Sequence, residues 1–233
     1  MISIIIPVYN QADKIIYTLE SIRKQSYQDV EVIIVNDGST DNVQDICARY
    51  FKKTESTINY LFLNQENKGA PSARNHGYKE SKGEYVFFCD ADAVLNIEAM
   101  ELLLSTLENN PKVSYAYSSF LWGRKIFKLG DFDADKLRKT PYIHTMSLIR
   151  RNDYPAVGWD ESIKKFQDWD LWLTMLEQGK VGIFVNKVLF KVLPGGTISS
   201  WLPSFAYKYL PFLPLVKKYN NALEIIKKKH GLS

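Results

Sequence analysis

The feature that most constrains the fold is a regular alternation of strand-like and helix-like segments in the first part of the chain. Each apolar run ends in a polar or turn-forming cluster, and helical spacing of apolar residues follows. The runs cover residues 2–8, 30–35, 58–63 and 85–89, and the helical segments cover 12–25, 42–51 and 71–78. Short connections between such elements predict a doubly wound α/β fold with a mainly parallel sheet and right-handed crossovers.

Polar side chains follow each of the predicted strands at its carboxyl end. They are Tyr9, Asp37, Lys68 with Arg74, and the pair Asp90 and Asp92. In open α/β sheets, ligands bind beyond the carboxyl ends of the strands. These side chains are therefore expected to converge on one binding edge.

Asp90-Ala91-Asp92 directly follows the apolar run Tyr85–Cys89. If the chain stays extended, both carboxylates point to the same side. Two carboxylates about 5 Å apart repel by roughly 3 kcal/mol at an effective dielectric near 20, and a divalent cation converts this repulsion into attraction. The alternative is a pair of solvated loop acids after a strand.

The second part of the chain has a looser pattern, and we place a soft boundary near residue 110. A helix is expected over 96–108, a strand over 112–121 and a charged loop with a short helix over 123–140. A strand over 142–150, a helix over 168–178 and strand-like runs over 181–185 and 188–192 complete the pattern.

A second acidic site is predicted where the helix over 168–178 begins. Asp168 stands among Trp159, Phe166, Trp169 and Trp172, and partial desolvation there would make a carboxylate a better base. The tryptophans are expected to anchor the helix in the core. For Asp170, stabilisation of the helix start is as good an explanation as any function.

His144 lies in a strand-like segment, where a lone histidine is more often structural. The alternative is that it faces an acceptor.

Charge and composition exclude some classes of protein. The formal net charge is +4, and residues 201–233 contain six lysines and one acid, so the remainder is close to neutral. Nucleic-acid binding by the main body is therefore not expected. Met1 leads directly into an apolar run without a basic segment, so we expect no signal peptide. Cys47 and Cys89 are expected to be core residues in a reducing compartment.

Residues 201–233 combine aromatic, basic and amphipathic character. Two interpretations stay open. The segment lies on an anionic membrane face, or its helix packs on the domain and exposes lysines to solvent.

Several motifs, taken together and in order, resemble the family 2 glycosyltransferases, which are inverting enzymes of the GT-A fold. The matching stretches are 4–10, 35–41, 67–69 with 73–75, 83–92, 158–161 and 167–172. The resemblance covers roughly residues 2–198. It implies a glycosyltransferase domain over 1–200, with a nucleotide-sugar half over 1–110 and an acceptor half over 111–200, followed by the C-terminal tail.

The resemblance also implies roles for individual residues. Asp92 would ligate Mn²⁺ or Mg²⁺, Asp90 would contact the ribose or the metal, and Asp168 would be the general base. Nucleotide-sugar contacts would come from Pro7, Tyr9, Asp37, Lys68, Arg74 and Asp90. The donor would be a UDP-sugar and the acceptor a hydroxyl of a glycan or lipid-linked glycan. The protein would work in the cytoplasm, with peripheral membrane contact through 201–233 left open.

Two departures from the family pattern matter for the site. Gln167 stands where the family often has Glu, and Pro194-Gly195-Gly196-Thr197 lacks the histidine that many members carry, so the cation's third partner is undefined. Three alternatives stay open: transfer to a polyprenyl phosphate, nucleotidyl transfer, and binding of nucleotide-sugar without catalysis. The segment Tyr9-Asn10-Gln11-Ala12 lacks the glycines and basic residues that favour nucleotidyl transfer.

Overall fold

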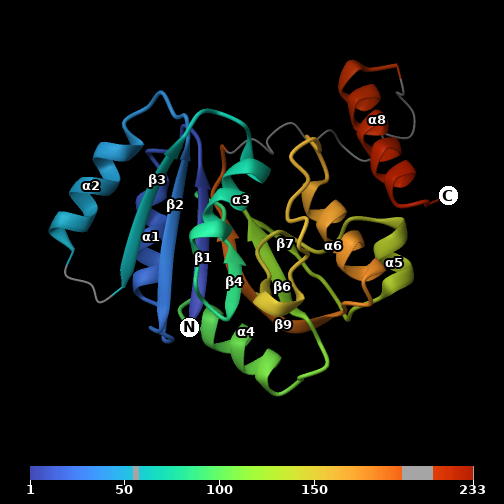
Figure 1. The fold of residues 1–233 in the computed structure, drawn as a ribbon, viewed down its shortest axis with the longest axis horizontal. Coiled ribbons are helices and arrows are strands. Elements are labelled where there is room, and N and C mark those ends of the chain that lie inside the picture. Colours follow the sequence, from blue (N-terminus) through green and yellow to red (C-terminus); the bar gives the residue numbers. More distant parts are fainter. Residues whose placement is uncertain (55–57, 196–211, 233) are drawn as a thin grey trace.

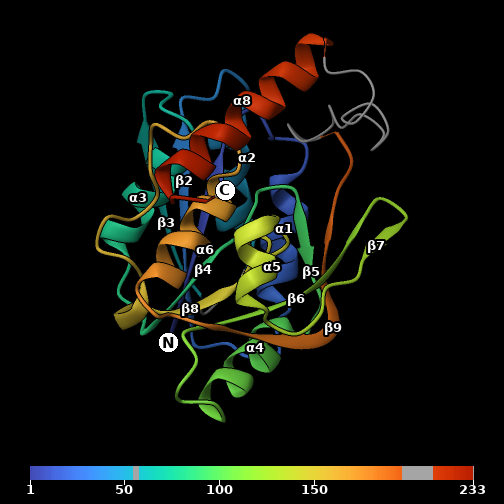
Figure 2. The ribbon, with the colours of Figure 1, turned by 90° about the vertical axis from the view of Figure 1, so that its right-hand side faces the viewer.

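The computed structural model describes residues 1–54, 58–195 and 212–232. Its centre is one mixed sheet, with described strands in the order β3-β2-β1-β4-β8-β6-β9-β5 and β7 paired to β6. Helices cover both faces of this sheet (Figures 1 and 2). The α/β, doubly wound, mainly parallel class expected from the sequence is therefore confirmed.

The first four strands form the parallel half of the sheet. They are β1 (Ile2–Val8), β2 (Val30–Asp37), β3 (Asn59–Gln65) and β4 (Tyr85–Phe88). β1 lies between β2 and β4, and β2 lies between β1 and β3, all in parallel register. The crossovers are α1 (Ile15–Arg23), α2 (Val43–Lys53) and α3 (Ala70–Glu80).

Two hydrophobic cores lie on opposite faces of the sheet because side chains alternate along each strand. On β1, Ile4 and Ile6 pack with α1, α2 and α4 (Ala99–Glu108), whereas Ile5 belongs to the core under α3 and α6 (Gln167–Glu177). Gly77 lets α3 approach closely, because a Cβ there would lie 2.5 Å from Cγ2 of Ile5. Both cysteines are buried and free.

The remaining strands extend the sheet beyond β4. β8 (Leu148–Arg150) is antiparallel to β4 and to β6 (Tyr115–Trp122), and β9 (Gly182–Val192) is parallel to β6. β5 (Ala93–Leu95) forms the far edge beside β9, and β7 (Lys125–Phe127) is a short extension of β6. Strands from both sides of residue 110 therefore share one sheet.

Several predicted boundaries in this half are wrong. The expected strand over 142–150 is limited to β8, because residues 142–147 form no ladder. The runs over 181–185 and 188–192 are a single strand, β9, whose pairing with β6 shifts register between them. β5 and β7 were not predicted, since three residues carry too little periodicity. The short helix in the charged loop is confirmed as α5 (Ala134–Lys139), and Arg151–Asp153 forms a 3₁₀ turn.

The C-terminal helix α8 (Pro214–Lys229) packs on α6 at one end of the molecule (Figure 2). Val216 and Ile226 are fully buried, and the ring of Tyr219 meets Phe166 edge-on at 5.0 Å. Packing of one helical stripe on the domain is therefore confirmed. Residues 201–211 of the predicted aromatic segment lie outside the described residues. Within the described part, no helix is both long and apolar enough to span a membrane.

Candidate active site

Asp37 ends β2 and is buried. Its carboxylate accepts hydrogen bonds from the Lys68 backbone N–H at 2.9 Å, the Gly69 N–H at 2.8 Å and the Gln65 side chain at 2.8 Å. Gly69 has φ of +94°, a conformation that glycine adopts without strain. Asp37 thus fixes the turn that leads into α3, and about one of its roughly four acceptor positions stays free for a ligand.

Tyr9 follows β1 and is 45% exposed at the sheet edge. The next residue, Asn10, has φ of +51°, and its side-chain oxygen accepts hydrogen bonds from the backbone N–H groups of Thr40 at 2.8 Å and Asp41 at 3.3 Å. Asn10 therefore joins the loops after β1 and β2, a role that sequence reasoning missed. Pro7 lies within β1, half-buried and paired with Val35.

Arg74 of α3 is a buried cation that joins the two acidic sites. Its guanidinium donates to Oδ1 of Asp90 at 3.2 Å and to Oε1 of Gln167 at 3.3 Å, and it lies 4.5 Å from the centroid of the Trp159 ring. Its Nε has no hydrogen-bond partner among the described residues. A buried guanidinium with a spare donor is suited to an anionic ligand.

The Asp90–Asp92 segment is a turn, not an extended continuation of β4, because the Ala93 N–H donates to the Asp90 carbonyl at 3.1 Å. The chain does not stay extended here, so the condition under which both carboxylates were expected to point to one side is not met. Asp90 pairs with Arg74. Asp92 is buried and has no ion pair within the described ranges. Burial, followed by the charge of Asp90, raises the pKa of Asp92 to about 6.

The carboxylate oxygens of this turn suit a hard divalent cation, but they do not form a complete metal site by themselves. No group of three or more histidine, cysteine or acidic side chains that could hold a metal occurs in the described part of the chain. Mg²⁺ is commonly bound by one or two carboxylates together with substrate phosphates. A buried carboxylate with a raised pKa is stabilised by a cation, so Asp92 fits this mode better than the already paired Asp90.

Asp168 lies in the first turn of α6, half-buried. The preceding Phe166 has φ of +61°, a strained value for a bulky residue of the kind that clusters at functional sites. Oδ1 of Asp168 accepts the Trp169 N–H at 2.9 Å. Burial raises the pKa of Asp168, while the nearby charges of His144 and Arg74 act in the opposite direction.

His144, for which a structural role and an acceptor-facing role were both left open, lies beside the candidate site and also makes structural contacts. Its Nε2 lies 3.9 Å from Oδ2 of Asp90, and its Nδ1 accepts the Met146 N–H at 3.2 Å. In the neutral ring this arrangement leaves the proton on Nε2, facing Asp90. Its ring also packs against Phe120 and Phe190, at centroid distances of 4.8 and 5.2 Å. The only sequence signal was its position within the predicted acceptor half, 111–200.

The segment before α6 is held by Asn75 of α3. The Asn75 side chain bonds the backbone N–H and carbonyl of Trp159, both at 2.9 Å, and the Glu161 carboxylate at 2.9 Å. Gly158 has φ of +64°, and a Cβ there would lie 2.6 Å from Oδ1 of Asn75. Trp159 is thereby placed under Arg74, so α3 positions both acidic sites.

Lysines flank the sheet edge on two sides. Lys68 is exposed beside Asp37. Lys14 donates to the Gly195 carbonyl at 2.9 Å, and its charge lowers the pKa of Asp92 in opposition to burial. Lys14 was not among the predicted site residues, because one lysine before a helix carries no sequence signal.

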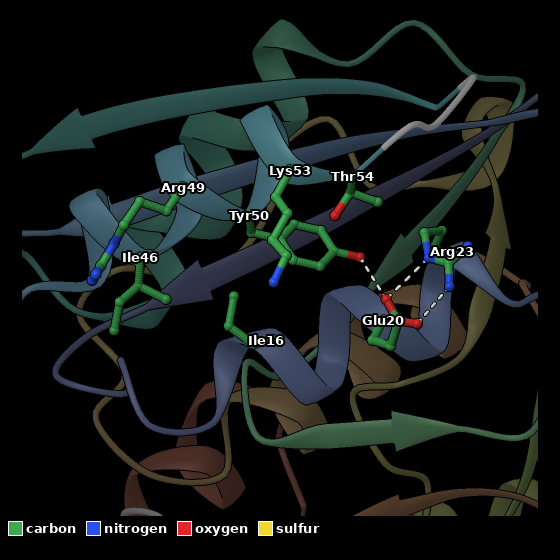
Figure 3. Close-up of a pocket in the computed structure, with 8 residues that line it drawn as sticks. All are labelled: Ile16, Glu20, Arg23, Ile46, Arg49, Tyr50, Lys53 and Thr54. Atoms are coloured by element: carbon green, nitrogen blue, oxygen red, sulfur yellow. Dashed lines mark hydrogen bonds and ion pairs between the residues drawn. The ribbon is translucent and has the colours of Figure 1, made fainter.

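A shallow hollow of about 690 Å³ lies between α1 and α2, away from the strand ends (Figure 3). Within it, Glu20 accepts hydrogen bonds from Arg23 and from the Tyr50 hydroxyl at 3.0 Å. The bond from Arg23 lowers the pKa of Glu20 to about 2. The acid in this hollow is therefore already neutralised, and the hollow contains none of the predicted site residues.

Comparisons with known proteins identify the family of the chain. The sequence profile described as glycosyl transferase family 2 matches residues 3–158. The chain belongs to glycosyl transferase family 2.

Similar curated proteins are an uncharacterised glycosyltransferase of Rickettsia bellii, 30% identical over 206 residues, and chondroitin synthase of Escherichia coli, 28% identical over 211 residues. The matches cover 82% and 85% of this chain but 28% and 30% of those proteins. The chain thus spans less than a third of the length of these relatives.

Solved structures share the fold. TarS of S. aureus in complex with UDP-GlcNAc has a TM-score of 0.70 and 21% identity, over 92% of this chain and 66% of that chain. The mannosyltransferase PcManGT of Pyrobaculum calidifontis, in complex with GDP-Man and Mn²⁺, has a TM-score of 0.70 and 21% identity, over 86% and 58%. The GT-A-type fold expected from the sequence is confirmed by these neighbours.

Proposed function

We propose that this family 2 glycosyltransferase moves a sugar, with inversion, from a UDP-sugar to a hydroxyl of a glycan or lipid-linked glycan. The observation that supports this most strongly is the Arg74 bridge. It joins Asp90 of the turn after β4 to Gln167, the residue before Asp168. The residues proposed to bind the sugar donor and the carboxylate of Asp168, whose pKa is raised, thus border one connected site. A direct displacement requires such an arrangement.

In this mechanism, Tyr9 stacks on the base and Asp37 uses its free acceptor position for a base N–H. Lys68 and Arg74 bind diphosphate oxygens. Asp92, with Asp90 beside it, would hold Mn²⁺ or Mg²⁺, which would supply positive charge to stabilise the departing diphosphate. These assignments rest on the resemblance and on the geometry of the turn.

Asp168 acts on the opposite side of the reacting sugar. It takes the proton of the acceptor hydroxyl while that oxygen forms the new bond to the anomeric carbon and the bond to the diphosphate breaks. Burial makes Asp168 more basic than an exposed aspartate. His144, with its Nε2 beside Asp90, helps to orient the groups between the two carboxylates.

A thermal-shift screen of nucleotide-sugars with Mn²⁺, followed by nucleoside diphosphate release, tests the proposal. Ligand at about a hundredfold excess over Kd stabilises by roughly 2.7 kcal/mol, which is a melting-temperature rise of about 5–10 °C at this chain length. We expect the largest rise with a UDP-sugar and its loss in EDTA. Stabilisation without turnover in the presence of acceptors would instead support a silent binding protein.

A further inference from the structure

A second groove, of about 530 Å³, lies between residues 162–165 and α8. The helix lines it with residues spaced by three and four positions, which places them on one face. They are Pro214, Lys217, Lys218, Asn221, Ala222 and Ile225. None of the predicted site residues lines this groove.

The charge of this groove is positive and uncompensated. Lys164, Lys165, Lys217 and Lys218 line it, and no carboxylate does. Among the residues that the structure describes, none of the four has an ion-pair partner; Lys164 donates only to the Glu161 carbonyl, at 3.2 Å. Acids nearby in sequence are engaged elsewhere: Glu161 accepts a hydrogen bond from Asn75, Asp160 pairs with Lys229 and Glu224 with Lys227. The groove is therefore complementary to an anionic partner.

Large apolar side chains are exposed beside these lysines. Phe212 is 65% exposed, Leu215 45% and Ile225 57%. The stripe of α8 that contains Leu223 and Ile226 is already packed against the core of the domain. α8 thus presents a second face that is both basic and apolar. Such a combination matches the headgroup region of an anionic bilayer, where lysines meet phosphates and apolar groups enter the acyl boundary.

We propose that this basic groove and the exposed apolar side chains of α8 dock the protein on an anionic lipid surface. Nucleic acid would satisfy the lysines but leaves the aliphatic side chains without a function. Residues 162–165 run directly into Phe166 and Asp168, so docking would bring the acceptor side of the site toward the lipid. That last consequence rests on the proposed function, whereas the docking itself does not.

Flotation of the full chain with vesicles tests the docking. We expect binding to phosphatidylcholine vesicles that contain phosphatidylglycerol, weakening with salt, and little binding to phosphatidylcholine alone. A variant with Lys164, Lys165, Lys217 and Lys218 all changed to Gln should bind several hundredfold more weakly, since each lysine near such a surface contributes about fivefold.

The matched control changes Lys52, Lys82, Lys112 and Lys139 to Gln, which removes the same charge from exposed positions elsewhere. We expect this control to keep most of the binding. Equal loss in both variants, or equal binding to neutral vesicles, would overturn the proposal. Displacement from the vesicles by an oligonucleotide would assign the groove to nucleic acid and also overturn it. The donor-induced thermal shift of each variant shows separately that the fold and the nucleotide site are intact.

Discussion

Asp90 and Asp92 are two residues apart, yet their surroundings give them different chemistry. Asp90 is neutralised by the buried Arg74 and lies near His144. Asp92 is buried without an ion pair in the described part of the chain, and its pKa rises to about 6. The sequence predicted that these acids matter but not how they differ, because the difference depends on a turn and on an arginine from another element.

Asp92→Asn should stabilise the free protein while impairing transfer. When the pKa of a carboxyl group is raised in the folded state, the folded protein loses stability as pH rises through that pKa. The ionised form of Asp92 therefore destabilises the folded protein at neutral pH. We expect the unfolding free energy to rise by roughly 1–3 kcal/mol at neutral pH without cation or nucleotide. Denaturant titration measures this. A destabilised variant would contradict the proposal that Asp92 lowers the stability of the free protein and serves to bind a cation. The control is Asp45→Asn, which changes an exposed aspartate of α2.

Asp168→Asn tests the general base. With a hydroxyl acceptor, we expect kcat to fall about 10²–10⁴-fold with donor binding unchanged, as measured by nucleoside diphosphate release and thermal shift. In the unchanged protein, kcat should rise with pH through the raised pKa of Asp168 and then level off, since the base acts when deprotonated. Full activity of the variant would favour a polyprenyl-phosphate acceptor, which needs no strong base.

At the scale of elements, α6 connects the site to the C-terminal helix. Its first turn carries Asp168, and its buried Asp170 accepts Nζ of Lys229 at 2.7 Å and bonds Nε2 of His230 at 2.9 Å. Nδ1 of His230 lies 2.7 Å from the Glu177 carboxylate. Because both ring nitrogens face carboxylates, the arrangement favours the protonated ring, in which both nitrogens donate. The sequence left open whether Asp170 stabilises the start of its own helix or has another role. In the structure its contacts with Lys229 and His230 hold α8 against α6.

This anchor predicts a pH dependence. Burial lowers the pKa of His230, but its hydrogen bonds to Asp170 and Glu177 outweigh burial and raise it above its ordinary value. The stabilisation is therefore complete below about pH 6.5 and is lost as pH rises through the folded pKa. The charged groups that contact the His230 ring are the carboxylates of Asp170 and Glu177. The ammonium group of Lys229, the preceding residue, pairs with the carboxylates of Asp160 and Asp170.

His230→Gln removes this contribution. We expect the difference in unfolding free energy between the two proteins to shrink as pH rises, in denaturant titrations across neutral pH. His76→Gln, which removes a histidine from α3, is the matched control. A difference that stays constant with pH would show that His230 acts by packing alone.

The parallel elements were the most predictable from the sequence, and the contacts between elements the least. Apolar runs and helical spacing located β1 to β4 and α1 to α3 to within a few residues. Nothing local could show that Asn75 holds Trp159, or that His230 reaches α6, because both contacts join segments distant along the chain. The tryptophans of α6 were correctly expected in the core, with Trp169 and Trp172 fully buried.

At the scale of the whole molecule, the site lies at one edge of a sheet shared by both parts of the chain. Convergence at that edge was predicted from the alternation of strands and helices and from the polar residues after each strand. The structure brings Arg74, Asp90 and Gln167 together there. Tyr9, Asp37 and Lys68 lie at the ends of the neighbouring parallel strands. Their roles in donor binding stay predictions, because a ligand's contacts depend on side-chain positions that no periodicity encodes.

The strand order also has a consequence for how the chain acquires its structure. β4 completes its pairing only with β8, and the described partner of β5 is β9, 95 to 99 residues later. Pairing of such distant segments is entropically costly to begin and slows folding. During synthesis, the parallel strands would therefore wait with the edge of β4 unpaired until residue 150 has emerged, and β5 would wait until residue 192. We expect the early strands to depend on these later ones, so that the molecule matures as a unit and not half by half.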